Sequence, residues 1–324
     1  MYYMIVNPAS RSGRGAKIWA KLESVLKEKQ IPYAVYFSGK AGQVTEIVHN
    51  LCDSILDTST DNIIKLIVLG GDGTMNETLQ GITDFSRVHV GYIPTGSSND
   101  LARDLQVTKD PVATLNRILT CQVPVPTDIG CVTLENTEDD LSANPDTKCW
   151  IKRYFAVSCG IGFDAAVCVE ALYSRFKRIM NKIGLGKLTY LGIALKQLIS
   201  AKKVSCEIIL DDKQTIHLRR FLFVAGMVHQ YEGGGFMFCP NADSHDGILD
   251  ICAIGDVPKP VILCALPTAF FGKHYFFNGV DRHAAQKLCL KSSSPLWVHT
   301  DGEVAVKANV ITMTCEKDQL QLLW

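Results

Sequence analysis

The stretch LIVLGGDGTMNETLQ, residues 66–80, carries an apolar strand pattern into a helical pattern through three glycines and one acid. Glycines allow a sharp turn and let the backbone approach a ligand closely. The unpaired N–H groups and partial positive charge at a helix N-terminus favour phosphate binding. Asp72 would repel a bare phosphate, so its position indicates an Mg²⁺ ion between carboxylate and phosphate. The alternative is a tight strand-to-helix turn in which Asp72 serves only as the N-cap.

Two further strand patterns in the first half of the chain end in polar, glycine-bearing loops. Residues 5–19 read IVNPASRSGRGAKIW, in which Arg11 and Arg14 are candidates for contact with phosphate oxygens. Residues 92–103 read YIPTGSSNDLAR, in which Asn99 and Asp100 open a helix, either as ligands or only as N-caps. Because the carboxyl ends of parallel strands share one edge of a sheet, three such loops predict a nucleotide-binding crevice there.

The composition is typical of a soluble globular protein, with 47% hydrophobic and 20% charged residues, and 324 residues predict two domains. Lys+Arg and Asp+Glu both number 33, so the overall charge points to no nucleic-acid partner. The twelve cysteines include no C-x-x-C pair, which favours reduced thiols over disulfides or structural zinc. Neither a signal peptide nor a bilayer-spanning apolar stretch is evident, so we expect a cytoplasmic protein.

Strand and helix patterns alternate over the first 125 residues, which predicts a parallel sheet covered by helices on both faces. Two prolines in CQVPVPTDIG, residues 121–130, mark a change to closely spaced short strands, typical of a sandwich or barrel. Helical patterns interrupt these strands at about 164–200 and 258–270, and residues 135–148 are expected to form an exposed hairpin loop. Strands are expected at 2–7, 33–38, 63–70, 88–94, 129–134, 152–159, 204–210, 215–227, 247–254, 286–293, 295–301 and 310–315.

The pair GGDGTMNE (70–77) and PTGSSNDLAR (94–103) resembles the diacylglycerol kinase catalytic domain family, which includes sphingosine kinases, ceramide kinases and soluble bacterial lipid kinases. The resemblance covers essentially the whole chain. It extends to NPASRSGRG (7–15), GIGFDA (160–165), YEGGGFMFCPNADSHDGILDI (231–251) and HTDGE (299–303).

The resemblance implies two domains with the site in the cleft between them. One is an ATP-binding α/β domain over residues 1–125, similar to NAD kinases and phosphofructokinases, which residues 305–324 rejoin. The other is a β-sandwich lipid-acceptor domain over residues 126–304. The implied activity is Mg²⁺-dependent transfer of the γ-phosphate of ATP to a lipid hydroxyl, diacylglycerol-like in the first place, within phospholipid metabolism.

Specific roles also follow from the resemblance. Asp301 would be the general base that takes the proton of the acceptor hydroxyl, with Glu303 beside it. Asp72 would belong to an aspartate–Mg²⁺ network that Asp128 joins. Two departures are that Gly13 comes later in its loop than is usual, and that Ser97 replaces a more common Thr. The implied nucleotide-binding residues are Asn7, Arg11, Gly70, Gly71, Gly73, Thr74, Glu77, Thr95, Gly96, Ser97 and Asn99.

Two Asp-Gly sequences carry an alternative reading, because Asp-Gly is also a strong signal for a plain hairpin turn. One is the Asp301-Gly302 pair. The other lies in ADSHDGILDI, where the resemblance implies a structural Mg²⁺ bound by the Asp246 carboxylate with main-chain oxygens of Asp243 and Ile248. Oxygen ligands suit Mg²⁺, and His245 is not expected to be a ligand.

Residues 165–203 contain eight Lys/Arg and a single acid among apolar residues. A basic amphipathic helix can lie on an anionic bilayer, which would place the enzyme peripherally on the inner face of the membrane. The alternative is a helix packed on the sandwich with a solvated basic face. The implied partners are therefore ATP and a membrane lipid, and relatives of this kind can form homodimers.

Two rival functions share the GGDG loop or the nucleotide site. A NAD kinase-like or other small-molecule kinase is disfavoured by SSNDLAR (97–103), which matches the lipid-kinase pattern, and by the basic amphipathic segment. A non-catalytic nucleotide sensor would bind ATP but would tolerate loss of the Asp301 and Glu303 carboxylates.

Overall fold

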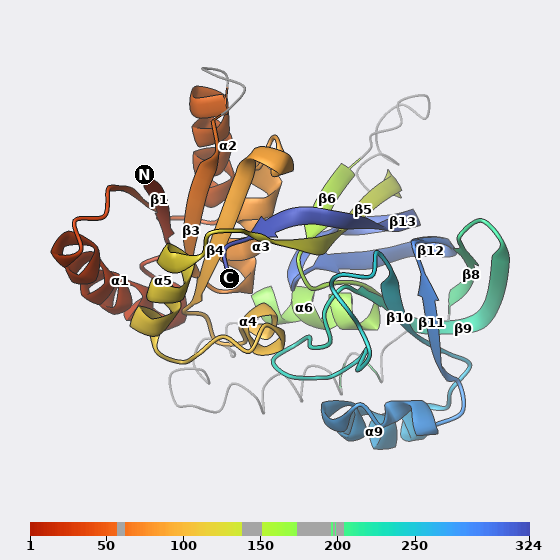
Figure 1. Ribbon diagram of the computed structural model, residues 1–324. Coiled ribbons are helices and arrows are strands. Elements are labelled where there is room, and N and C mark those ends of the chain that lie inside the picture. The colour runs from red at the N-terminus through yellow and green to blue at the C-terminus, as the bar shows by residue number, and fades with distance from the viewer. Residues whose placement is uncertain (57–61, 138–150, 174–195, 197, 199–203) are drawn as a thin grey trace.

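The structure is a computed structural model that describes residues 1–56, 62–137, 151–173, 196, 198 and 204–324. Figure 1 shows a helix-covered N-terminal part beside a C-terminal part built mainly from strands. The two parts meet where the last strand, in blue, runs back toward the N-terminal strands.

The N-terminal part contains four parallel strands in the order β2-β1-β3-β4. Alternate residues of β1 point to opposite faces, so Met4 and Val6 enter one core and Ile5 enters the other. Helices α1 and α5 cover the first face, and α2 and α3 cover the second. The strands are β1 (Tyr2–Val6), β2 (Tyr33–Phe37), β3 (Ile64–Gly70) and β4 (Val88–Pro94), and the helices are α1 (Ser10–Glu28), α2 (Gln43–Leu56), α3 (Asp72–Gly81), α4 (Asp100–Asp104) and α5 (Pro111–Thr120), with the 3-10 turn η1 (Phe85–Arg87).

The C-terminal part is antiparallel in every strand pair among its described residues. Its strands are β5 (Val125–Thr137), β6 (Ile151–Phe155), β7 (Ser158–Gly162), β8 (Val204–Leu210), β9 (Gln214–Met227), β10 (Leu249–Gly255), β11 (Val280–Ala285), β12 (Lys287–Thr300) and β13 (Glu303–Leu322). Its helices are α6 (Phe163–Tyr173) and α9 (Lys259–Thr268), followed by the short 3-10 turns η2 (Ala269–Phe271) and η3 (His274–Phe276).

The final strand connects the two parts. Most of β13 pairs with β5 and β12, whereas Gln321 and Leu322 at its end pair in parallel with β4. Leu320 and Leu322 also enter the apolar core beneath α2 and α3. The strands of the described residues therefore form one continuous sheet. The division into domains at residues 125 and 305 stays a prediction.

Strands β5 and β13 are much longer than the expected 129–134 and 310–315, and the structure differs from the expected strands at three further places. The strand expected at 152–159 is broken at Ala156 and Val157, because their N–H groups donate to the Asp301 carboxylate. The strands expected at 286–293 and 295–301 are one strand, β12, whose register shifts between Lys291 and Leu296. Strand β11 was not anticipated, because VDRHAA has little apolar content.

Two predicted surface segments fall largely outside the described residues. Only the start of 135–148 is described, although β5 and β6 on either side do pair as a hairpin. Of residues 165–203, α6 and positions 196 and 198 are described, so the predicted membrane contact of this segment lies mostly beyond them. Among the described helices, none combines the length and the apolarity that crossing a bilayer requires.

Candidate active site

The loops that follow β1, β3 and β4 meet at one edge of the sheet. The Asn7 side-chain amide donates to the Thr74 hydroxyl at 3.2 Å, which joins the first loop to the start of α3. The hydroxyls of Ser10 and Thr95 lie 2.6 Å apart, and the Thr95 N–H donates to the Gly70 carbonyl at 2.7 Å. The three polar strand ends singled out in the sequence are therefore bonded to one another.

The second and third loops also touch backbone to backbone. A Cβ added to Gly96 would lie 2.6 Å from the Cα of Gly71, so neither loop has room for a side chain at the contact. The Asn99 amide holds the third loop by donating to the Gly96 carbonyl at 3.0 Å. Bare backbone on both sides leaves N–H groups accessible to a phosphate chain.

A cavity of about 580 Å³ opens over these loops. Arg11 lies on its rim, in a left-handed turn over residues 11–13 that precedes the regular part of α1. The cavity borders on both the loops that follow β1, β3 and β4 and the hairpin that carries Asp301. Its lining residues are Asn7, Ala9, Ser10, Arg11, Ser38, Gly39, Lys40, Ala41, Val44, Gly71, Asp72, Gly73, Thr74, Glu77, Gly96, Ser97, Ser98, Asp301, Gly302 and Glu303.

Asp301 occupies a two-residue hairpin turn between β12 and β13. Asp301 and Gly302 have φ of 51° and 82°, the pair of positive values that a type I′ turn requires. The plain-turn reading of this Asp-Gly pair is therefore correct in geometry. The same turn projects the Asp301 carboxylate toward the break between β6 and β7, so the turn and a functional role are compatible.

Four hydrogen bonds hold the Asp301 carboxylate. One oxygen accepts from the N–H groups of Val157 and Ser158 at 2.8 and 3.1 Å. The other accepts from the Ala156 N–H at 2.8 Å and from the Asn76 side-chain amide at 2.9 Å. Four donors match the four acceptor sites that a carboxylate offers. Three of them are backbone groups, so the Asn76 amide is the one that can turn away.

Asn76 was not among the residues expected from the sequence to have a functional role. Its side chain is fully buried on α3, where it also donates to the Tyr154 carbonyl and accepts from the Arg153 guanidinium at 3.1 Å. Asn76 thereby joins α3 to the hairpin of Asp301 and to β6. Its one signal in the sequence is its place four residues after Asp72, which puts both residues on one face of the helix.

Asp72 lies beside two other acids in a dry environment. The Asp100 N–H donates to one Asp72 oxygen at 3.1 Å, while the other Asp72 oxygen is buried without a hydrogen-bond partner. One oxygen of Asp100 accepts from the Gly234 N–H at 2.8 Å, and the other lies 3.4 Å from the Arg103 guanidinium. Burial, followed by the negative charges of Asp100 and Asp301, raises the pKa of Asp72 to about 7. A buried Asp72 oxygen without a partner, beside the carboxylates of Asp100 and Asp301, fits a divalent cation, which would satisfy it and neutralise the repulsion.

Glu303 and Glu77 differ in how freely they face the cavity. Gly73 leaves room for Glu303, because a Cβ there would lie 2.5 Å from a Glu303 oxygen. Burial, then the charge of Glu77, raises the pKa of Glu303. The Glu77 carboxylate accepts the N–H groups of Gly42 and Val44 at 2.9 and 3.1 Å, so it secures the start of α2. A direct nucleotide contact for Glu77 stays a prediction.

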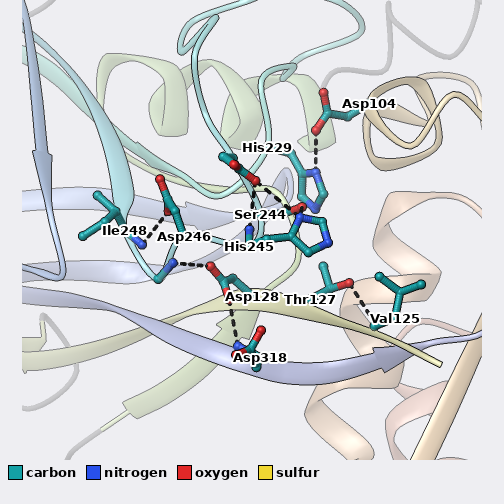
Figure 2. Close-up of polar contacts among 12 residues, drawn as sticks. Asp104, Val125, Thr127, Asp128, His229, Ser244, His245, Asp246, Ile248 and Asp318 are labelled. Atoms are coloured by element: carbon teal, nitrogen blue, oxygen red, sulfur yellow. Dashed lines mark hydrogen bonds and ion pairs between the residues drawn. The ribbon is translucent and has the colours of Figure 1, made fainter. Parts of the chain in front are cut away.

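Asp128 lies apart from the acids around Asp72. It is fully buried, and its two oxygens accept the N–H groups of Gly247 and Asp318, each at 2.7 Å. Figure 2 shows it between β13 and the loop of Asp246. The Asp128 carboxylate thus ties this loop to β13, and the acid bonded to Asp72 is Asp100 instead. A metal role for Asp128 stays a prediction.

The loop around Asp246 is an exposed turn stabilised by its own carboxylates. Asp246 accepts the Ile248 N–H at 2.9 Å, and Asp243 accepts the His245 N–H at 3.1 Å (Figure 2). Partial burial, followed by the charges of Asp243, Asp250 and Asp128, raises the pKa of Asp246. Such crowding of acids is compatible with a cation, and the metal role of Asp243, Asp246 and Ile248 stays a prediction.

The buried side chain of His299 accepts a hydrogen bond from the backbone of the Asp301 hairpin. His299 Nε2 lies 2.9 Å from a Glu232 oxygen and 3.1 Å from an Asp164 oxygen, and the Gly302 N–H donates to His299 Nδ1 at 3.1 Å. Gly160 of the GIGFDA motif leaves space for this contact, since a Cβ there would lie 2.0 Å from Asp164. This cluster was not expected from the sequence, although His299 precedes Asp301 by two residues.

The hydrogen bond from Gly302 decides the protonation of His299. Because Nδ1 accepts from the Gly302 N–H, the neutral ring carries its proton on Nε2 and donates it toward the two carboxylates. A histidine that binds a metal donates its other ring N–H instead. The spacing of Asp164, Glu232 and His299 would suit a cation, but this arrangement favours a shared proton. Burial raises the pKa of Glu232. Burial lowers the pKa of His299, but the surrounding negative charges and hydrogen bonds, including those of Glu232, raise it well above its usual value, so the proton is held between the two groups.

We therefore expect Glu232→Gln to be tolerated, because glutamine resembles the neutral carboxyl. Its transfer rate should stay within about threefold of wild type, whereas His299→Leu, which releases the Gly302 N–H, should lose about tenfold through misplacement of the hairpin. Kinetics on both variants, with metal analysis of the purified wild type, test this. Bound metal in wild type together with equal losses in the two variants would contradict the shared-proton arrangement.

Comparisons with known families cover nearly all of the chain. Residues 1–132 match the diacylglycerol kinase catalytic domain, and residues 157–324 match the YegS C-terminal NAD kinase beta sandwich-like domain. YtlR of Bacillus subtilis, a candidate lipid kinase, is 24% identical over 306 residues, covering 94% of this chain and 93% of the relative. A diacylglycerol kinase of Mycobacterium tuberculosis is 26% identical over 302 residues, covering 93% and 88%.

The fold has a counterpart among solved structures. A candidate diacylglycerol kinase from Bacillus anthracis superposes with a TM-score of 0.72 at 19% sequence identity, covering 100% of this chain and 96% of that one. At this identity the likeness extends to the fold, and it includes both the N-terminal part and the β-sandwich-like part.

Proposed function

Because the chain belongs to the diacylglycerol kinase-like family of lipid kinases, we propose that it transfers the γ-phosphate of ATP to the hydroxyl of a diacylglycerol-like lipid. The observation that carries this proposal is that one and the same cavity borders on both the glycine loops and the Asp301 hairpin. Phosphoryl transfer needs a donor site and an acceptor-activating group within reach of each other. The cavity provides both.

The phosphates of ATP would lie over Gly71 and Gly96, at the N-terminus of α3. The first-turn N–H groups of α3 have no partner within the helix and would donate to phosphate oxygens. Mg²⁺, bound through Asp72 and Asp100, would supply charge neutralisation. Asn7 and Thr95 hold the loops in register, and Arg11 and Ser97 on the cavity lining would contact the nucleotide directly.

The acceptor hydroxyl would approach Asp301. Since four donors already fill the Asp301 carboxylate, the hydroxyl gains a place there when the Asn76 amide turns away. Asp301 would then orient the hydroxyl and take its proton as the new bond forms. A loose transition state requires little proton transfer early in the reaction, which suits a carboxylate that is held mainly for position.

The family supports a bilayer lipid as the acceptor. The enzyme would therefore act at a membrane surface, on its cytoplasmic side. The chain itself does not distinguish diacylglycerol from phosphatidylglycerol, a sphingoid base or a polyprenol, all of which offer a hydroxyl at an interface. Diacylglycerol is proposed first because relatives carry that name. The Asp246 loop would have a structural role, whether or not it binds a cation.

A transfer assay with labelled ATP and Mg²⁺ tests the proposal. We expect label in a lipid from a panel of diacylglycerol, phosphatidylglycerol, a sphingoid base and a polyprenol, and none in NAD or fructose 6-phosphate. Label in NAD or in the sugar phosphate would instead support the soluble-acceptor alternative. Binding of Mg·ATP without transfer to any acceptor would support a nucleotide sensor.

A further inference from the structure

Helix α9 is apolar on the side that faces solvent. Pro260, Leu263, Cys264 and Pro267 are exposed at spacings of three and four residues, which is one stripe of a helix. The opposite side is buried through Ile262 and Ala265. A surface helix of a soluble protein normally turns polar residues outward, so an outward apolar stripe marks an interaction site.

The apolar stripe continues into the two 3-10 turns that follow and contact α9. Phe270, Phe271 and Phe276 are 46%, 74% and 83% exposed, and Leu263 is 40% exposed. These four are half of the large hydrophobic residues exposed in the described parts of the chain, although they occupy only residues 263–276. We call Pro260, Leu263, Cys264, Pro267, Phe270, Phe271 and Phe276 the α9 surface.

The α9 surface is attached to the glycine loop over residues 231–238. The Phe270 ring stacks on Phe236 with centroids 4.0 Å apart, and the Met237 N–H donates to the Ala269 carbonyl at 2.8 Å. The other end of this loop reaches the acids of the active site, where the Gly234 N–H donates to Asp100 at 2.8 Å. In Figure 1 the loop runs between α4 and α9. The exposed aromatic residues are therefore connected to Asp100 in the candidate active site through one short loop.

The charges around the α9 surface indicate which kind of partner it would bind. No Asp or Glu occurs between Asp256 and Asp281, while Lys259 precedes the apolar residues and Lys273 lies among them. Aromatic residues bordered by lysine are typical of segments that enter the headgroup region of a bilayer, and anionic lipids attract such lysines. Interfaces between proteins are instead depleted in lysine.

We propose that the α9 surface docks on an anionic lipid bilayer and brings the active site to the membrane that holds the acceptor. The proposal rests on the lipid-kinase function and assigns the membrane contact to a segment other than residues 165–203. Phe271 and Phe276 would insert among the headgroups, and Lys273 would lie near lipid phosphates. The 231–238 loop would connect the docked surface to Asp100.

The test uses the full chain and vesicles of phosphatidylcholine with and without phosphatidylglycerol. Phe271 and Phe276 are mostly exposed, so a Phe271→Ser/Phe276→Ser variant should fold as wild type. We expect wild type to float with the phosphatidylglycerol vesicles and the double variant to bind them about tenfold to a hundredfold more weakly. Lys273→Gln should lose the part of binding that depends on phosphatidylglycerol. Val123→Ser, at a residue 77% exposed in the loop before β5, should bind as wild type.

Kinase assays separate this proposal from the proposed function. The double variant should lose activity on diacylglycerol in vesicles but keep it, within about twofold, on a short-chain diacylglycerol dissolved as monomers. Undiminished vesicle binding by the double variant would overturn the docking proposal, as would a wild type that phosphorylates the soluble lipid but never binds vesicles. A dimer that dissociates in the double variant, seen by light scattering, would instead make the α9 surface an interface between copies. Vesicle binding without phosphorylation of any lipid would count against the kinase function alone.

Discussion

Asp301→Asn is expected to slow phosphoryl transfer by at least about a hundredfold, which is what a positioned base contributes. The substitution removes the carboxylate that would accept the hydroxyl proton. It also places an NH₂ group against two of the donors that now bond to Asp301, because both sides of the carboxylate face N–H groups. Facing donors should lower the free energy of unfolding by about 1–3 kcal/mol. Single-turnover kinetics and thermal unfolding measure the two effects.

Two further variants distinguish the role of Asp301 as a base from the role of the groups that position it. Asn76→Ala removes one donor but keeps the carboxylate, so it should slow transfer by about tenfold at most. Asp212→Asn, at an exposed hairpin aspartate whose partner is Lys287, should leave the rate unchanged. If Asp301→Asn kept its full rate, Asp301 would not be the base. If Asn76→Ala lost as much as Asp301→Asn, the hairpin position rather than proton transfer would account for the loss.

Asp72→Asn is expected to change activity and stability in opposite directions. Without the carboxylate charge the cation would be held weakly, so transfer should fall by about a hundredfold to a thousandfold. The metal-free variant should nevertheless be more stable than wild type at pH 8. Asparagine keeps an oxygen for the Asp100 N–H, and it removes a charge that burial and neighbouring acids disfavour.

The pH dependence of this stability follows from the sign of the shift. The pKa of Asp72 is about 7 in the folded protein and 3.8 for the aspartate in the unfolded chain, so between these values the folded chain binds the extra proton. The stabilising contribution is present below about pH 4 and is lost as pH rises through about 7. One pKa unit corresponds to about 1.4 kcal/mol, so a shift from 3.8 to about 7 gives roughly 4 kcal/mol between the limits.

Unfolding of the metal-free proteins by denaturant at pH 5 and pH 8 tests this. The difference in free energy of unfolding between Asp72→Asn and wild type should be large at pH 8 and small at pH 5. Asp53→Asn, at an exposed aspartate paired with His49 on α2, serves as the control. A variant that loses both activity and stability at pH 8 would show that Asp72 is a structural residue, and a variant with full activity would remove it from the cation site.

The sequence indicated the glycine-bearing loops after β1, β3 and β4 because neighbouring residues in the chain are enough to specify them. A strand that ends in glycine, an acid and a helix start specifies its turn through residues that are neighbours in the chain. The shared edge of parallel strands then predicts that the loops at Asn7, Gly70 and Thr95 meet, and they do so through direct hydrogen bonds. The Asp301-Gly302 turn was also readable, because a type I′ hairpin favours this pair.

The tertiary structure decided which groups surround each acid. Asn76 and Asp301 are 225 positions apart in the chain, so no local pattern relates them. The neighbour of Asp72 is Asp100 rather than Asp128, because Asp128 is held by the backbone of Gly247 and Asp318. Likewise, the pattern of α9 shows an apolar helix, and only packing shows which side remains exposed. Sequence determines turns and helix starts through short-range sterics, whereas partners and burial depend on contacts that exist only after distant segments pack together.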